Sequence, residues 1–492
     1  MKQGDLRGQE GVQGHRGPKN LRAEVRASVV ASKPGNSGGA KGTQEDGSAM
    51  IAPNESKPST VPKEATQDGD IRLRWSWVEQ SVWTARMLTA LEQGVRGGVW
   101  FSLIDKVWSE GNLSAAAAKV AANKGASGVD HVSIEQFMKE MDTNLKTISE
   151  QLRQGTYQPQ AIRRVEIPKP GSKELRPLGI PTVRDRIVQG AIRHVMEPIF
   201  ERKFAEHSYG FRPGRGCKDA LRHVQALLDQ GYIYVVDADL KSYFDSIPHE
   251  PLIKRVKECV ADGRLLKLIE AFLKAEIMHG FKEWTPEAGA PQGAVLSPLL
   301  SNIYLNPLDH KMAALGLEMV RYADDFVILC RSLEEAEQAL TQVRQWTTEA
   351  GLTLHPTKTR IVNAVTEGFA FLGYEFRERR RVPHDKSMRK LRDTVRQHTR
   401  RHNGHSMRVI VDKLNGSLRG WFEYYKHSHS WVFSRLDRWV RVRLRSLLRR
   451  RHHLRGRGRG ADHQRWPNAY FTELGLFNLE AALVAIRQSS RR

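Results

Sequence analysis

The sequence predicts an α+β fold behind a disordered N-terminal tail, and three observations support this prediction. Residues 1–70 are rich in Gly, Ser, Pro, Lys and Glu and have few large apolar side chains, so they cannot bury enough surface to offset the entropy of ordering. From about residue 75 onwards, segments with helical spacing of apolar residues are mixed with short apolar strands. The stretch 387–453 is mostly basic helix.

The individual helices and strands are placed by their apolar periodicity. Helical spacing predicts helices at 81–95, 114–130, 133–146, 185–204 and 333–350, of which the second ends in a Gly-rich loop. Prolines break 163–181 into short strands and turns. Apolar runs predict further strands at 231–240, 318–330 and 369–377.

Positive charge is concentrated in one segment of the chain. The net charge of the whole sequence is +23, yet residues 376–460 alone contain 26 Lys or Arg and 6 Asp or Glu. So large an excess of positive charge repels itself unless a polyanion screens it. A nucleic acid is therefore the predicted partner of this segment, and the alternative is a solvated helical surface.

Several classes of protein are excluded by composition. No apolar run approaches the roughly 20 residues of a membrane span, and the N-terminus lacks the apolar stretch of a secretory signal. Cys217, Cys259 and Cys330 are far apart and odd in number, which fits neither a disulfide framework nor a four-cysteine zinc site. We expect an intracellular protein of the cytoplasm with no membrane partner.

Carboxylates interrupt two apolar strands. The strand at 231–240 runs into Asp237 and Asp239, which alternation places on one face, and Asp324 with Asp325 divides the apolar runs of 318–330. Carboxylates held this close raise each other's pKa unless a divalent cation neutralises them. An Asp-Asp turn alone is weak evidence, because turns favour Asp. One acid at a strand end and two more in a hairpin predict a site for two-metal phosphoryl transfer.

Three segments carry a resemblance to reverse transcriptases. DADLKSYFD (237–245) and RYADDFVIL (321–329) resemble the first and third palm motifs of these enzymes, and APQGAVLSPLLSNIYL (290–305) resembles the motif between them. More narrowly, the chain resembles the reverse transcriptase and maturase proteins encoded by bacterial group II introns. The supporting segments are NKGASGVD, IPKPGSKELRPLGIPTVRDRIVQGAI, SYGFRPGRG, GLTLHPTKTRIV, FLGYEF and LRGWFEYY.

The resemblance implies a right-hand polymerase with fingers, an antiparallel palm and a helical thumb. Behind the tail at 1–70, which composition predicts and which departs from the family pattern, we expect the following divisions: an N-terminal helical segment at 71–115, fingers at 116–235, palm at 236–376, thumb or maturase (X) domain at 377–460, and a C-terminal segment at 461–492. The resemblance implies RNA-directed DNA polymerisation and assistance to intron splicing, with two Mg²⁺ ions as cofactors.

The family pattern also carries roles onto single residues. It implies that Asp239, Asp324 and Asp325 are catalytic metal ligands, with the Leu240 carbonyl as a further ligand. Nucleotide-binding roles fall on Lys169, Arg176, Phe244, Gln292, Gly293 and Lys358. Phe244 matches the aromatic that excludes a ribose 2′-hydroxyl, and core packing is its alternative. Asp237 is expected to be structural.

The basic segment interleaves arginines with aromatics. We expect most of its aromatics to form the core of thumb helices, with stacking on RNA bases as the alternative; they are Trp421, Phe422, Tyr424, Tyr425, Trp431, Phe433 and Trp439. The flanking arginines are expected to face RNA: Arg435, Arg438, Arg441, Arg443, Arg445, Arg449, Arg450 and Arg451. Expected partners are a group II intron RNA, an RNA template with a DNA primer, target DNA and dNTPs, with a possible homodimer and association with the bacterial nucleoid.

Three other functions remain open. The chain could be a non-catalytic RNA splicing factor, although all three acids are present. It could be a reverse transcriptase recruited to a host task such as phage defence, or an RNA-dependent RNA polymerase, which Phe244 disfavours. The chain has no cysteine after Cys330, so the metal-binding endonuclease domain of many relatives is expected to be absent.

Overall fold

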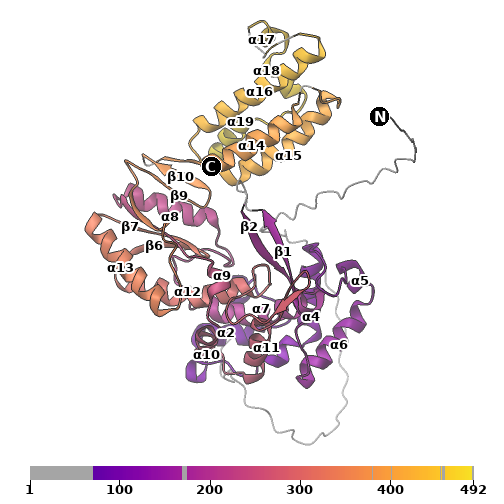
Figure 1. Ribbon diagram of the computed structural model, residues 1–492, viewed down its shortest axis with the longest axis vertical. Coiled ribbons are helices and arrows are strands. Elements are labelled where there is room, and N and C mark those ends of the chain that lie inside the picture. The colour runs from indigo at the N-terminus through magenta and orange to yellow at the C-terminus, as the bar shows by residue number, and fades with distance from the viewer. Residues whose placement is uncertain are drawn as a thin grey trace, which may run out of the picture. The chain divides into compact units, whose positions relative to one another are not determined.

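The structure, a computed structural model, describes residues 70–168, 174–378, 380–400, 402–454, 456 and 460–489 (Figure 1). The predicted disordered tail at 1–70 lies outside this range except for its last residue. Lys169 also lies outside it. Among the described residues no helix is both long enough and apolar enough to span a membrane.

The N-terminal part is helical, as the periodicity predicts. Its elements are α1 (Ile71–Arg74), α2 (Ala85–Gln93), η1 (Arg96–Gly98), α3 (Ile104–Val107), α4 (Glu110–Ala122), α5 (Ile134–Lys139), α6 (Met141–Gln154), α7 (Val183–Glu201) and α8 (Cys217–Asp229). Helix α7 is buried along most of its length. The Gly-rich loop after α4 packs tightly against the start of α7, since a Cβ on Gly128 would lie 2.6 Å from the Cα of Thr182, the residue before that helix. This close contact leaves no room for a side chain at position 128, which explains the glycine there.

A four-stranded sheet in the order β2-β1-β4-β5 forms the predicted fingers hairpin and its neighbour. Strand β1 (Ile162–Pro168) pairs antiparallel with β2 (Leu175–Ile180) and parallel with β4 (Ile277–His279), which pairs in turn with β5 (Lys282–Trp284). Helices α9 (Tyr243–Ser246), α10 (His249–Lys257) and α11 (Gly263–Leu273) lie between β3 and β4 in the sequence.

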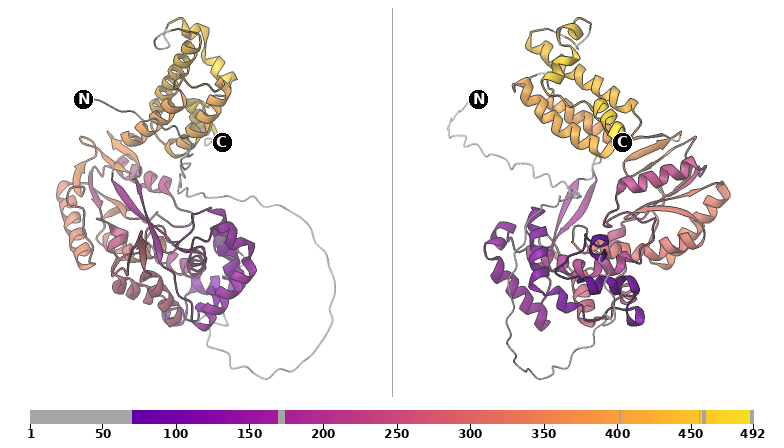
Figure 2. Two further views of the ribbon diagram at one scale, coloured as in Figure 1. Left: turned by 45° about the vertical axis from the view of Figure 1, so that its right-hand side comes forward. Right: turned by 180° about the vertical axis from the view of Figure 1, so that it is seen from behind.

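The central sheet is antiparallel, in the order β6-β7-β3-β8. Its strands are β3 (Tyr234–Asp239), β6 (Glu318–Tyr322), β7 (Asp325–Cys330) and β8 (Arg360–Asn363). Helices α12 (Ser297–Ala314) and α13 (Leu333–Glu349) contribute to the core on one face, and α8 to the core on the other. Figures 1 and 2 show helices on both sides of these strands.

Strand alternation divides the central sheet between two cores. Val236 of β3 and Ile328 of β7 belong to the core shared with α12 and α13, whereas Val235 and Val327 belong to the core shared with α8. Because successive side chains of a strand point to opposite faces, each strand carries apolar residues at nearly every position. This is why 231–240 and 318–330 read as continuous apolar runs.

A small sheet and a helical domain complete the chain. Strands β9 (Phe369–Phe371), β10 (Tyr374–Arg377) and β11 (Arg380–Pro383) form an antiparallel sheet. The helices that follow are α14 (Asp385–His398), α15 (Met407–Tyr425), α16 (Trp431–Arg451), α17 (Asp462–Arg465), α18 (Asn468–Glu473) and α19 (Leu479–Ser489).

The last three helices share the core of the thumb. Trp466, Phe471 and Leu483 are buried in the same cluster as residues of α14, α15 and α16. The carboxylate of Asp437 in α16 accepts hydrogen bonds from the backbone N–H groups of Leu479 and Glu480 at 3.1 and 3.0 Å, which caps the start of α19. Residues on both sides of the predicted division at residue 460 thus pack into one core, which α17–α19 share with α14–α16.

This shared core gives a stability test with a neighbouring control. Leu483 is 4% exposed and Val484 is 48% exposed, although both lie on α19. We expect Leu483→Ala to lower the free energy of unfolding by about 2–5 kcal/mol, because it leaves a cavity in the thumb core. Val484→Ala should change it by less than about 0.5 kcal/mol. Urea unfolding followed by circular dichroism measures both, and equal small effects would contradict a shared core.

Candidate active site

The three predicted catalytic acids lie together where strands β3 and β7, the two inner strands of the central sheet, end and begin. Asp239 ends β3 and Asp325 begins β7, and the antiparallel register pairs these two residues directly. Directly opposed residues have Cβ atoms about 4.5–5.5 Å apart. Asp324 lies in the turn that joins β6 to β7, next to Asp325. Residues 86 positions apart in the sequence are thus brought together by strand pairing.

The turn carrying Asp324 is tight and closely supported. Tyr322 pairs with Asp325, so Ala323 and Asp324 alone make the connection. Ala323 has a φ of 61°, in the left-handed region that costs a residue with a side chain roughly 1 kcal/mol. A Cβ on Gly210 would lie 2.2 Å from the Ala323 N, so only glycine permits this approach. The SYGFRPGRG segment therefore packs directly under the turn.

A buried ion pair holds the turn from beneath. Arg321 is fully buried, and its Nε donates to the Asp309 carboxylate at 2.7 Å. Its NH1 donates to the Ala323 carbonyl at 2.8 Å and to Asn302 Oδ1 at 3.0 Å. The Asn302 Nδ2 donates in turn to the Gly210 carbonyl at 2.8 Å. Helix α12, the hairpin and the glycine segment are thus joined through one guanidinium.

The carboxylates of the site destabilise one another as anions. Burial, together with repulsion from Asp237, Asp324 and Asp239, raises the pKa of Asp325 to about 7. Burial, together with Asp239, also raises the pKa of Asp324. Burial raises the pKa of Asp237, which Arg360 opposes from 3.6 Å. A bound cation would therefore stabilise the ionised carboxylates of this site.

Asp237 belongs to this electrostatic cluster. It lies two residues before Asp239 on the same face of β3, and its charge is the largest single repulsion acting on Asp325. We predicted a structural role for it, and its ion pair with Arg360 fits that role. Strand alternation was the signal in the sequence that places it beside the catalytic acids.

Two backbone groups complete the surroundings of the acids. The Leu372 backbone, in the turn between β9 and β10, lowers the pKa of Asp325 and so opposes part of the effect of burial. Leu240 faces Leu354 in an antiparallel bridge, and the bonds of that bridge are made by neighbours: Lys241 N donates to Thr353 O and His355 N donates to Asp239 O. The Leu240 carbonyl consequently points away from this pairing.

Lys358 contacts Asp239, one of the predicted catalytic acids. Its Nζ lies 2.6 Å from the Asp239 carboxylate, and both side chains are partly exposed. The Lys358 ammonium balances the negative charge of Asp239, which shows that a cation can lie beside this carboxylate. Among the described residues, no three Asp, Glu, His or Cys side chains form a closed metal cage. An ion here would need oxygen ligands from a substrate or from water as well, which is usual for Mg²⁺ at a phosphate site.

The predicted nucleotide-binding loop is tied to the fingers strand. The Gly179 N–H of β2 donates to the Gln292 carbonyl at 2.7 Å, and the Ala290 N–H donates to the Phe244 carbonyl at 2.7 Å. Gly293 has a φ of 106°, and a Cβ there would lie 2.4 Å from the Gly179 carbonyl oxygen. The loop thus needs glycine at 293 and links Phe244 to β2.

The two predicted phosphate-gripping residues differ in what the structure describes. Arg176 is exposed on β2, opposite Ile167 of β1. Lys169 lies outside the described residues. Phe244 is partly buried, and its ring lies 5.5 Å from that of Tyr243, so packing contributes to its position.

The predicted RNA-facing arginines fall into two groups. Arg435, Arg438, Arg450 and Arg451 are exposed, and Arg441 and Arg443 are partly so. Arg445 is only 2% exposed: its guanidinium donates to the Trp466 carbonyl and to Asn468 Oδ1, both at 2.9 Å, and lies over Phe471. The prediction that Arg445 faces RNA is therefore corrected, because this side chain holds α18 in the thumb.

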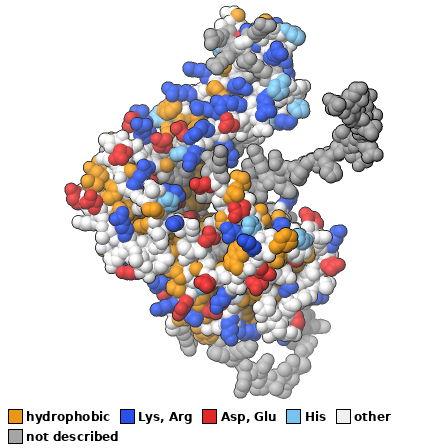
Figure 3. All heavy atoms as spheres, in the orientation of Figure 1, with side chains coloured by type: hydrophobic (Ala, Val, Ile, Leu, Met, Phe, Trp, Pro, Cys, Tyr) orange, Lys and Arg blue, Asp and Glu red, His pale blue; other side chains and the backbone are white. Residues whose placement is uncertain are grey.

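Arg449 has a comparable internal partner. Its NH1 lies 2.8 Å from the Asp462 carboxylate, whose side chain is 5% exposed. A buried carboxylate needs such a cation, so the pair fastens α17 to α16. The exposed arginines that remain give this part of the surface its dense Lys and Arg content (Figure 3).

Sequence reasoning missed the supports of the site. Arg321, Asp309 and Asn302 have no catalytic pattern of their own, and only the fold shows that they meet under the turn. A charged residue inside an otherwise apolar strand was the one available signal for Arg321. Nothing in the sequence marks Asp309 as its partner.

Two protein families match this chain. Residues 167–376 match the family described as reverse transcriptase (RNA-dependent DNA polymerase), and residues 388–466 match the family described as group II intron, maturase-specific domain. The first match contains the catalytic acids, and the second contains most of α14–α17.

Three curated relatives show the extent of the similarity. Protein YkfC of Escherichia coli is 36% identical over 54% of this chain and 81% of its own length. The group II intron-encoded protein LtrA of Lactococcus lactis is 40% identical over 41% of this chain and 33% of LtrA. The putative COX1/OXI3 intron 1 protein of Saccharomyces cerevisiae is 27% identical over 62% of this chain and 43% of that protein. The match spans less than half of each intron protein.

Mg²⁺ binding should depend on pH. The raised pKa of Asp325, about 7, means that this group carries a proton below pH 7 which a metal must displace. Without metal, protonation favours the folded state, so Asp325 stabilises the fold more as pH falls from 7 towards 4. With metal the dependence reverses: we expect the rise in Tm caused by Mg²⁺ to be larger at pH 8 than at pH 6.

The apparent affinity should weaken by up to about tenfold per pH unit below 7. Thermal unfolding with and without Mg²⁺ at the two pH values measures the effect, and Asp325→Asn should remove its pH dependence. A Mg²⁺ effect that is the same at pH 6 and pH 8 in the wild type would contradict the assignment of Asp325.

Arg321 should contribute strongly to stability. In Arg321→Met the Asp309 carboxylate stays buried without its partner, so we expect the free energy of unfolding to fall by about 3–5 kcal/mol. The double variant Arg321→Met/Asp309→Leu should recover part of this loss, since no buried charge remains. Arg331→Met, at the exposed end of β7, is the control and should cost less than about 1 kcal/mol. Chemical denaturation of the four proteins decides; equal losses at 321 and 331 would refute the proposed support.

Proposed function

Because the chain belongs to the group II intron-type reverse transcriptases, with a maturase-specific segment behind the polymerase, we propose that it is an RNA-directed DNA polymerase that binds its intron RNA. It assists splicing of that RNA and copies it into DNA. The single observation that carries this proposal is the pairing of Asp239 with Asp325, with Asp324 in the adjoining turn.

The acids fit a pair of Mg²⁺ ions. Asp239, Asp324 and Asp325 would hold the ions with the Leu240 carbonyl, and the mutual repulsion that raises the pKa of Asp325 supports this. When bound, such ions activate the primer 3′-hydroxyl and stabilise charge on the pyrophosphate leaving group. Lys358 balances Asp239 and lies close enough to the acids to contact an incoming triphosphate.

The residues around the acids select and orient a dNTP. Phe244 stands after the catalytic strand and is fastened to the Pro-Gln-Gly loop through the Ala290 N–H, which supports its role against a ribose 2′-hydroxyl. Gln292 and Gly293 line the sugar. Arg176 on β2 offers a bidentate fork to phosphate, and Lys169 adds a second cation there.

The thumb binds the nucleic acid. Its exposed arginines, including Arg435, Arg438 and Arg450, would neutralise phosphates of the intron RNA or of the RNA template paired with a DNA primer. Target DNA and a second copy of this chain are further proposed partners. The match to a maturase-specific domain favours an intron function over recruitment to a host task, and the three acids disfavour a splicing factor without catalysis.

Primer extension tests the polymerase. We expect the purified protein to extend a DNA primer on an RNA template with dNTPs and Mg²⁺, and Asp324→Ala/Asp325→Ala to lower the rate by more than about a hundredfold, because the ions lose their ligands. Glu334→Ala/Glu337→Ala removes the same charge from the exposed face of α13 and should extend normally. No extension by the wild type, with RNA binding retained, would leave the splicing factor as the function.

A further inference from the structure

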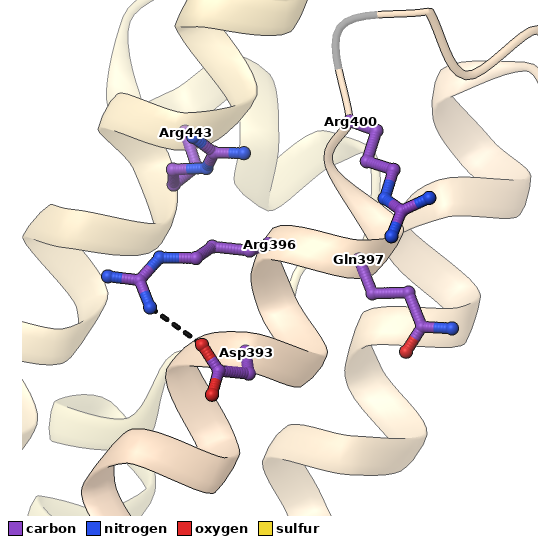
Figure 4. A pocket seen from close by; sticks show the side chains of 5 residues that line it. All are labelled: Asp393, Arg396, Gln397, Arg400 and Arg443. Atoms are coloured by element: carbon purple, nitrogen blue, oxygen red, sulfur yellow. Dashed lines mark hydrogen bonds and ion pairs between the residues drawn. The ribbon is translucent and has the colours of Figure 1, made fainter.

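Three arginines converge in a pocket between α14 and α16, away from the catalytic acids. The pocket has a volume of about 460 Å³ and is lined by Asp393, Arg396, Gln397, Arg400 and Arg443. Figure 4 shows Arg443 reaching in from one helix and Arg400 from the other side. Three guanidiniums face one carboxylate, so the pocket carries an excess of positive charge that suits an anion.

The arginines are held in place in different ways. The Nε and NH2 of Arg443 donate to the Thr399 Oγ1 and carbonyl, both at 3.1 Å, which fixes its guanidinium beside the end of α14. Arg396 NH1 donates to Asp393 at 2.7 Å, yet the Arg396 side chain remains 54% exposed. Asp393 pairs with Arg396, and Arg400 and Arg443 add two further guanidiniums to the lining of the pocket, a donor set that suits a phosphate.

A second pocket adjoins the first and shares Arg396. It has a volume of about 430 Å³, with Trp431 and Trp439 among its lining residues and Met388 and Leu436 adding apolar surface. Trp431 is 40% exposed, unlike most aromatics of this domain. The Arg435 guanidinium lies 4.7 Å from the Trp431 ring centre, and Arg396 lies 5.9 Å from that of Trp439. Aromatic rings thus alternate with arginines along the groove.

We propose that the two pockets together bind one unpaired nucleotide of the bound RNA. The base enters the Trp431–Trp439 groove, and its phosphate lies against Arg396, Arg400 and Arg443. This inference rests on the proposed function, since it names how the thumb reads an RNA that the protein binds.

The chemistry of the groove favours an unpaired base. Aromatic side chains stack only on bases that are splayed out of a helix, and an exposed Trp among arginines suits such stacking. Glu375 and Asp385 also line the groove; their carboxylates repel phosphate but accept hydrogen bonds from base amino groups. The groove, with its aromatic rings and two carboxylates, therefore takes the base, and the arginine pocket takes the phosphate. An acidic peptide is less suited, because these two carboxylates would repel it.

The test compares the affinity of the protein for two RNA hairpins whose duplexes have the same number of base pairs. One carries a single bulged 2-aminopurine, and the other is fully paired. Fluorescence anisotropy measures the affinity of the full-length protein for each, and the quenching of 2-aminopurine reports stacking. We expect the wild type to prefer the bulged hairpin by about tenfold, within the range of base–aromatic stacking.

The variants separate the groove from general charge. Trp431→Ala should abolish both the preference and the quenching while leaving the affinity for paired RNA unchanged, and Trp431→Phe should restore part of each. Arg396→Ala/Arg400→Ala should reduce the preference. Arg389→Ala/Lys390→Ala is the charge-matched control, because it removes two positive charges from exposed positions of α14, and it should weaken both hairpins equally.

Each outcome decides between distinct statements. Equal affinity of the wild type for both hairpins, or a preference retained by Trp431→Ala, would overturn the nucleotide pocket while primer extension stands. Displacement of the bulged hairpin by polyglutamate but not by single-stranded oligoribonucleotide would assign the groove to an acidic protein instead. Failure to bind either hairpin, together with failed primer extension, would overturn the proposed function itself.

Discussion

The site depends on one buried ion pair, between Arg321 of β6 and Asp309 of α12. The same guanidinium that meets Asp309 also holds the Ala323 carbonyl and Asn302. A buried pair of this kind is costly to form and more costly to break, because removing one partner leaves an unpaired charge without water. The turn that carries Asp324 is therefore fixed by an interaction that involves no catalytic residue.

This support is needed because the site opposes its own formation. The carboxylates of Asp237, Asp239, Asp324 and Asp325 lie close together, and burial, together with repulsion among them, raises the pKa values of Asp237, Asp324 and Asp325. Ala323 adds a left-handed backbone. Strain and repulsion of this sort persist only where the surroundings over-determine the geometry. Gly210, the Arg321 guanidinium and the register of β3 with β7 supply those constraints.

In the thumb, arginine side chains serve two purposes. Some of its arginines are internal and hold helices together: Arg445 of α16 donates a hydrogen bond to Asn468 of α18, and Arg449 of α16 pairs with Asp462 of α17. Others remain on the surface and give it its charge (Figure 3). Because Arg has a long apolar stem and five donors, one residue type serves both packing and recognition. The net charge of a segment therefore overstates the charge that it offers to a partner.

The sequence by itself determined the α+β class, the strands that carry the acids and the family motifs. Strand alternation and tight-turn chemistry are local, so they can be read from neighbouring residues. Only the tertiary structure decided which residues meet across longer separations: Asp309 with Arg321, Gly210 with Ala323, and Arg396 with Arg443. It also placed Arg445 inside the thumb and joined 461–489 to its core. Burial and charge compensation depend on packing between distant segments, and no local pattern encodes that packing.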